Sequence, residues 1–285
     1  MEDPAMSFGP PGPPGPPPPA TPPPPPQHLH THVRAHTDPH AAPPYVPGPP
    51  VPPPPGPPVP TPGPAPVLRS PLGLATALTV LFSLTAAVDL FSAGVGAYAG
   101  SVAQAMIDDP VHIDEVAAHT ADTLTAITAA LQLLCLIGTA AVFLVWFHRV
   151  RGNGQIFRPN AFTQSPGWAI GGWFIPFANL WLPLRTAREI WTASTRLDPT
   201  GTLVRTSTTP VTAWWSLWIA SIFASRVSGT FHDRADTPEA LQEAAYLGIL
   251  TDLISVAGAV CALLFVRKLT AMQHTMATQG PHARP

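Results

Sequence analysis

Charge is scarce in this chain. Only 11% of its 285 residues are Asp, Glu, Lys or Arg, and Lys268 is its single lysine. A soluble domain usually carries about 25% charged residues. The formal net charge is −2, so we expect no strongly basic surface of the kind that binds nucleic acid. The scarcity of charge instead favours a protein with much of its surface in lipid.

Cysteine and recognisable catalytic motifs are also scarce. Cys135 and Cys261 are the only cysteines, and both lie in apolar segments. That pattern argues against a disulfide scaffold and against zinc, so we interpret both as small buried residues. The chain also lacks a phosphate-binding glycine loop and the HExxH, CxxC and GxSxG motifs. We therefore predict a protein that is not an enzyme and that needs no cofactor.

The chain shows no secretory signal. Residues 1–20 have neither the basic start nor the apolar core of such a peptide. We expect the first apolar stretch, which begins near Leu72, to act as its own insertion signal.

Proline is abundant, with 41 residues, most of them before position 68. Proline lacks an amide donor and fixes φ, so residues 1–68 are predicted to be a disordered proline-rich cytoplasmic tail with polyproline II character. Such a tail could bind a cytosolic partner. Its clustered imidazoles could bind a transition metal, but a solvated linker is the favoured interpretation because nothing preorganises them: His28, His30, His32, His36 and His40.

Four apolar stretches are long enough to cross a membrane, since about 20 residues span the hydrocarbon core. They cover residues 72–97, 124–147, 211–229 and 245–266. A fifth apolar stretch, 167–184, is interrupted by Pro176, Asn179 and Pro183. Backbone freed by proline at membrane depth is tolerated only inside protein or beside water. This stretch is therefore predicted to be re-entrant or to lie in the interface, and the sequence does not choose between the two.

The predicted fold is an all-α membrane protein. A four-helix transmembrane bundle carries one re-entrant or interfacial helix that is broken by Trp and Pro. This transmembrane domain covers residues 69–270, and residues 271–285 are expected to form a short disordered C-terminal tail.

Charge placement predicts the orientation of the bundle. The loops on one side are basic and hold Arg149, Arg151, Arg158, Arg185, Arg188, Arg196, Arg205, Arg267 and Lys268. The loops on the other side are acidic, with only Arg234 basic, and hold Asp108, Asp109, Asp114, Glu115, Asp122, Asp233, Asp236, Glu239 and Glu243. Positive residues favour the cytoplasmic side. We expect a plasma (inner) membrane protein with four crossings and both termini in the cytoplasm.

The stretch that runs GWAIGGWFIPFANLWLPLRTAREIWTAS carries a resemblance. It is similar to the signature of the bacterial domain-of-unknown-function 4328 family, which the matching residues carry: Gly167, Trp168, Trp173, Phe174, Ile175, Pro176, Asn179, Leu180, Pro183, Arg188, Glu189, Ile190 and Trp191. The resemblance extends over about residues 70–270. It implies several membrane spans and often a Pro/Gly-rich N-terminus, but no activity.

Three charged residues lie inside the apolar stretches: Asp89, Arg226 and Asp252. Such residues usually face a bundle interior and pair. The four-crossing topology places all three at comparable depth, so Arg226 is predicted to pair with one or both acids. A proton or cation site is one interpretation. A salt bridge that fixes helix packing is the favoured one.

The favoured function is a non-enzymatic membrane scaffold or interaction module that presents its proline-rich tail to cytosolic partners. The alternative is a small transporter or channel-like protein built around Asp89, Arg226 and Asp252. The lipid bilayer is an expected partner, and a homo-oligomer is left open.

Overall fold

The computed structural model describes residues 67–281. Predictions for the proline-rich tail and its histidines lie outside these residues, except at positions 67 and 68. All regular elements described are helices, apart from one isolated bridge between Leu197 and Leu203. They are α1 (Leu72–Asp108), α2 (Glu115–Phe157), η1 (Pro159–Ala161), α3 (Trp168–Gly171), η2 (Ala178–Leu180), α4 (Leu182–Ala193), α5 (Thr209–His232) and α6 (Pro238–Gln279).

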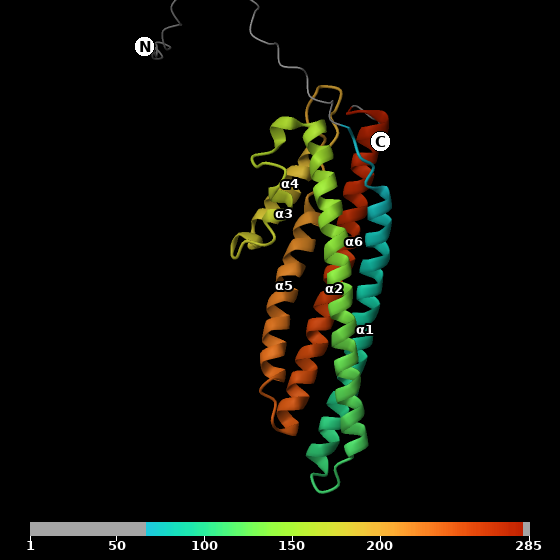
Figure 1. Ribbon diagram of the computed structural model, residues 1–285, viewed down its shortest axis with the longest axis vertical. Coiled ribbons are helices and arrows are strands. Elements are labelled where there is room, and N and C mark those ends of the chain that lie inside the picture. Colours follow the sequence, from blue (N-terminus) through green and yellow to red (C-terminus); the bar gives the residue numbers. More distant parts are fainter. Residues whose placement is uncertain (1–66, 282–285) are drawn as a thin grey trace, which may run out of the picture. The chain divides into compact units, whose positions relative to one another are not determined.

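Four long helices lie side by side and alternate in direction (Figure 1). Helix α1 packs against α2 and α6, and α6 packs against α1 and α5. We call the end with the α1–α2 and α5–α6 turns the hairpin end. The other end, where α1 begins, α6 ends and residues 158–208 lie, is called the motif end.

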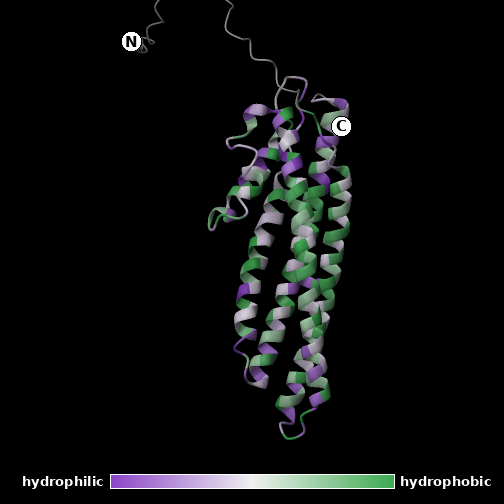
Figure 2. Ribbon diagram, viewed as in Figure 1, coloured by the Kyte–Doolittle hydropathy of each residue, from purple (hydrophilic) through white to green (hydrophobic). Residues whose placement is uncertain are grey.

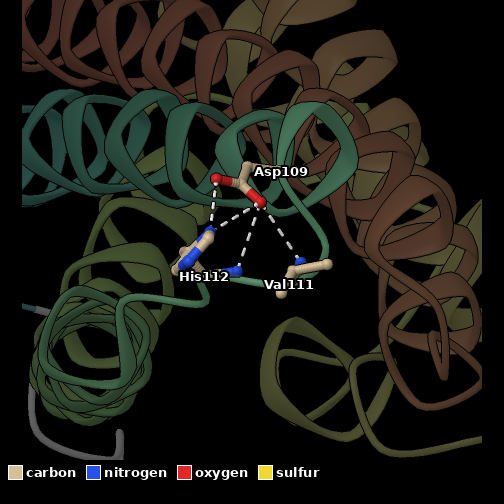
Figure 3. A network of polar contacts seen from close by, with 3 residues as sticks. All are labelled: Asp109, Val111 and His112. Carbon is tan, nitrogen blue, oxygen red and sulfur yellow. Dashed lines mark hydrogen bonds and ion pairs between the residues drawn. The ribbon is translucent and has the colours of Figure 1, made fainter.

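The turns at the hairpin end are built from short polar side chains. Asp109 ends α1, and its carboxylate accepts hydrogen bonds from the backbone N–H groups of Val111 and His112 (Figure 3). The His112 ring lies 3.0 Å from the same carboxylate. Asp114 then caps α2 by accepting a hydrogen bond from the Ala117 amide. The Asp114 contact satisfies a backbone donor that would otherwise be left free at the start of α2, and the Asp109 contacts satisfy two donors of the turn.

Three helices, α1, α2 and α6, are long and apolar enough to cross a membrane. Only 17% of the residues in the most apolar windows of α1 and α2 are buried, so large apolar side chains such as Leu134 and Leu136 face outward. Apolar residues dominate the middle of the long helices and polar ones gather near their ends (Figure 2). Such a surface suits lipid, so the chain has the features of a multi-pass integral membrane protein.

The helices are longer than the predicted apolar stretches. Helix α2 has 43 residues, a length of about 65 Å, against about 30 Å for a hydrocarbon core. Helix α6 continues to Gln279, well into the segment 271–285 for which the sequence predicted a disordered tail. Its last turns are buried at Gln273 and Met276, which explains why they stay helical. Residues 282–285 lie outside the described part.

As the sequence predicted, the stretch 167–184 is broken and does not form a continuous helix. It consists of the four-residue α3, a turn, the single turn η2 and the start of α4. Pro183 sits in the first turn of α4, where its missing N–H costs nothing. Helices α3 and α4 both pack on α2, and α4 also contacts α5.

Candidate functional site

Trp173 joins the broken segment to the bundle. Its ring contacts Phe143 and Phe147 of α2 on one side, with centroids 5.7 and 6.0 Å away. On the other side it contacts α5, with centroid distances of 5.9 Å to Trp215 and 5.3 Å to Trp218. Phe143 of α2 also contacts Trp214 of α5 directly, at 5.5 Å between centroids, and Trp173 extends this bridge between the two helices near the motif end.

The chain reverses just after Trp173 in a strained turn. Phe177 has φ 62° and ψ −45°, and it is the only described non-glycine residue with positive φ. The Ala178 amide donates to the Pro176 carbonyl at 2.7 Å, which closes a γ-turn around Phe177. This form of γ-turn is rare and strained. The side chain it presents is 77% exposed.

The tip of this turn is apolar and uncovered. Phe174 is 70% exposed, and Ile175 and Trp181 also lie open. Trp173 contacts Phe143 and Trp218, which lie within apolar stretches of α2 and α5. Trp173, which directly precedes the tip, is therefore level with apolar stretches that are predicted to cross the membrane.

Helix α4 leads away from the tip and has two distinct faces. Its inner face is buried at Ala187, Ile190 and Trp191, and the Trp191 ring stacks on Phe265 of α6. Its outer face forms an open pocket of about 410 Å³ whose lining residues are Ala161, Trp181, Leu184, Arg185, Arg188, Glu189 and Thr192. Two arginines and a tryptophan thus follow one another along the exposed side of α4.

The charges of this pocket are only partly compensated. Glu189 pairs with Arg185 at 3.4 Å and accepts a hydrogen bond from the Thr163 hydroxyl at 2.6 Å. Arg188 is exposed and has no ion pair with any described residue. Arg188 and Glu189, adjacent in the sequence, therefore act separately, and the pocket keeps a cation available for an anionic group.

Two arginines, Arg151 in the last turns of α2 and Arg158 just after that helix, hold the segment next to this pocket. Arg151 donates to Gln155 Oε1 and to the Gln164 carbonyl, both at 2.7 Å, and its guanidinium lies 3.5 Å from the Phe162 ring centroid. Arg158 donates to the carbonyls of Thr192 and Thr195, at the end of α4. Burial lowers the pKa of the Arg158 guanidinium below its ordinary value.

A buried amide network fastens the motif end of three helices. The Gln273 amide donates to the Val150 carbonyl at 2.8 Å and to Ser194 Oγ at 3.1 Å, and its oxygen accepts from Asn153 Nδ2. Asn153 also exchanges two hydrogen bonds with the backbone of Arg69. Gln273 is 1% exposed, so α2, α4 and α6 are joined by polar contacts away from solvent.

The remaining residues of the family-like motif have structural roles within the broken segment. Gly167 precedes α3, whose first residue, Trp168, is 38% exposed. Asn179 is half-buried in η2. The motif as a whole thus describes one folded element, from the start of α3 to the buried Trp191.

The structure brings Asp89 and Asp252 together through a residue that the sequence analysis did not single out. Gln132 Nε2 donates to Asp89 Oδ1 at 3.0 Å and to Asp252 Oδ1 at 2.9 Å. The three residues come from α1, α2 and α6. Asp89 is 4% exposed, and its Oδ2 has no hydrogen-bond partner among the described residues.

Arg226 does not join this cluster. It lies on the exposed side of α5, and no ion pair links it to Asp89 or Asp252 in the described structure. Helix α5 packs on α6 and not on α1, which keeps Arg226 away from Asp89. The predicted arginine–aspartate pair is thus replaced by an aspartate–glutamine–aspartate cluster.

Other polar groups offer little further chemistry. Within residues 67–281, no group of three or more His, Cys, Asp or Glu could hold a metal ion. Cys135 and Cys261 are both free thiols. A second open pocket of about 420 Å³ lies between the end of α6 and residues 194–206, and includes Lys268.

Comparison with known proteins identifies the family. The family model described as "Domain of unknown function (DUF4328)" matches residues 109–271, so the chain belongs to this family. The match contains α2 to α5 and most of α6, with the broken segment at its centre. No curated protein matches. No solved structure matches either.

Proposed function

We propose that this DUF4328 protein is a non-enzymatic membrane scaffold whose broken segment forms a platform for anionic phospholipid at the inner leaflet. The observation that carries the proposal is the strip of exposed apolar side chains at Phe174, Phe177 and Trp181, which leads directly to Arg185 and Arg188. Aromatic rings favour the headgroup boundary, and arginine binds phosphate through two parallel hydrogen bonds.

The proposed topology has four crossings, with α5 as the fourth. Helix α5 is not among the three helices that are long and apolar enough to cross, since Arg226 and three tryptophans lower the hydropathy of its apolar stretch. It nevertheless packs along α6, and tryptophans near the start of a span suit the interface. The basic residues gather at the motif end and the acidic ones at the hairpin end, which supports a cytoplasmic motif end.

In this topology the broken segment enters the inner leaflet and returns. Its tip around Phe177 inserts among acyl chains, and α4 lies in the interface with its buried face on the bundle. A purely apolar tip would favour lipid of any headgroup. The two arginines add a preference for negative headgroups, worth about 1 kcal/mol each near a membrane surface.

The test is the stabilisation of the purified full chain by lipid. Phosphatidylglycerol should raise the Tm in detergent, whereas phosphatidylcholine should raise it much less. The double variant Arg185→Gln, Arg188→Gln should bind phosphatidylglycerol roughly 30-fold more weakly, as about 2 kcal/mol implies. Arg205→Gln, a change of an exposed arginine outside the pocket, is the matched control. An unchanged response of the double variant would refute the platform.

The tail completes the proposed scaffold. In this proposal the proline-rich residues 1–68 are the ligand of a cytosolic protein, since proline-rich segments dock in aromatic-lined grooves. A pulldown with the full chain and with a chain that lacks residues 1–68 tests this part. Partners that remain bound without the tail would show that it is not the binding element.

The alternative function, a small transporter or channel-like protein, depends on the intramembrane cluster. That cluster contains Asp89 and Asp252 but has Gln132 where Arg226 was expected. Flux into proteoliposomes separates the two functions, because a scaffold moves no solute.

A further inference from the structure

We propose that Asp89, Asp252 and Gln132 form a binding site for one monovalent cation, a proton or Na⁺, inside the bundle. This site is distinct from the lipid platform and rests on separate residues.

The first argument is the missing counter-charge. Asp89 is the only charged residue of α1 before its last turn, and Asp252 is the only one between residues 244 and 266 of α6. One amide nitrogen contacts both carboxyl groups, so they are close neighbours. Two negative charges at such a separation repel strongly in a medium of low dielectric constant. Charged groups in a bilayer normally pair, yet no described basic residue is paired with either acid.

The second argument is an uncompensated oxygen atom. Asp89 is 4% exposed, and the hydrogen bond that it accepts from Gln132 of α2 goes to Oδ1. Oδ2 is buried without any described hydrogen-bond partner. A buried polar atom without a hydrogen-bond partner costs free energy, and the lipid around the bundle cannot supply the hydrogen bonds that water would. A bound cation would supply that partner.

The third argument is the chemistry of the neighbouring groups. Two carboxylates, the Gln132 amide and the Ser92 hydroxyl, which hydrogen-bonds Asp252, surround the position. They are oxygen and nitrogen groups without a thiol or imidazole, so a hard cation is favoured over a soft transition metal. A proton and Na⁺ share this preference for carboxylate oxygen.

Charged groups elsewhere do not reach the site from the packed helices. Helix α2 has no charged residue between 123 and 147. Helix α5 contributes Arg226, which is exposed and not paired with either acid. Any cation dependence of the bundle interior should therefore require Asp89 and Asp252 themselves.

The experiment measures the Tm of the purified full chain in detergent. In one series NaCl replaces N-methylglucamine chloride at constant ionic strength and pH. In the other, pH falls in sodium-free buffer. The saturating cation should raise the Tm by about 5–10 °C, and this rise should vanish in Asp89→Asn and in Asp252→Asn. The control Asp236→Asn, in the α5–α6 turn, should respond as the parent chain does.

The two series identify the ion. A rise with Na⁺ at constant pH assigns Na⁺, and a rise only on acidification assigns the proton. No response in either series, or the same response in the aspartate variants, would overturn the proposal.

Should the variants fold poorly, a hydrophobic carbodiimide that modifies buried carboxyl groups provides a second measurement on the unaltered chain. Modification of Asp89 or Asp252 should slow with Na⁺ if Na⁺ binds, or with rising pH if the proton binds. A rate that neither ion changes would contradict the site.

Discussion

Replacement of Trp173 by alanine should loosen the broken segment from the bundle. The ring contacts five aromatic neighbours with centroids between 5.3 and 6.4 Å: Phe143, Phe147, Trp214, Trp215 and Trp218. Each aromatic pair is worth about 0.5–1.5 kcal/mol beyond area burial, but pairs that share one ring are not additive. Removal of a packed Trp side chain costs about 3–5 kcal/mol in soluble cores. We expect the lower figure, about 3 kcal/mol, because lipid can fill part of the space.

Thermal unfolding in detergent measures this loss. For a domain of this size, about 3 kcal/mol corresponds to a fall in Tm of roughly 6–12 °C. Trp168→Ala is the matched control, since Trp168 belongs to the same segment, is 38% exposed and has no described aromatic contact. It should lower the Tm far less. Equal effects of the two substitutions would refute the role of Trp173 as a bridge between α2 and α5.

Two further predictions concern polar contacts at the motif end. Gln273→Met should destabilise the chain by about 1–3 kcal/mol, because it removes the buried hydrogen bonds that Gln273 makes with the Val150 carbonyl, Asn153 and Ser194, whereas Gln279→Met at the exposed end of α6 should have almost no effect on the Tm. Hydrogen bonds from Thr200 and Thr202 lower the pKa of Asp198 to about 2, from an ordinary 3.8, so the order they give the 198–202 turn is complete above about pH 4 and is lost as pH falls toward 2. Hydrogen exchange at the Thr200 and Thr202 amides, corrected for intrinsic rates, should accelerate over that range, and Asp198→Asn should remove the pH dependence.

Much of the helical layout could be predicted from the sequence because it depends on local composition. The apolar stretches mark the helices, and Pro176, Asn179 and Pro183 mark the break. The ends of the helices were less predictable. Helix α6 extends to Gln279 because Gln273 and Met276 are buried against other elements, and a count of apolar residues does not register such packing.

The intramembrane cluster shows the limit of reasoning from charge alone. Opposite charges predicted that Arg226 would pair with an aspartate. Helix order decides which side chains meet, and α5 packs mainly on α6 and not on α1. Gln132 is neutral and was overlooked. It is the only Asn or Gln between residues 124 and 147, so a search for lone amides in apolar helices would have found it. The position of Trp173 between α2 and α5 needed the tertiary structure.

The most direct test of the account is the sidedness of the broken segment. In a background without Cys135 and Cys261, single cysteines replace the exposed Ser165, before α3, and Ser207, before α5. A third replaces Val111, which is 81% exposed at the hairpin end. A membrane-impermeant maleimide on intact cells should label position 111 and spare 165 and 207, and all three should react once the cells are opened. Labelling of only one of positions 165 and 207 in intact cells would show that the segment crosses the membrane and would contradict the account.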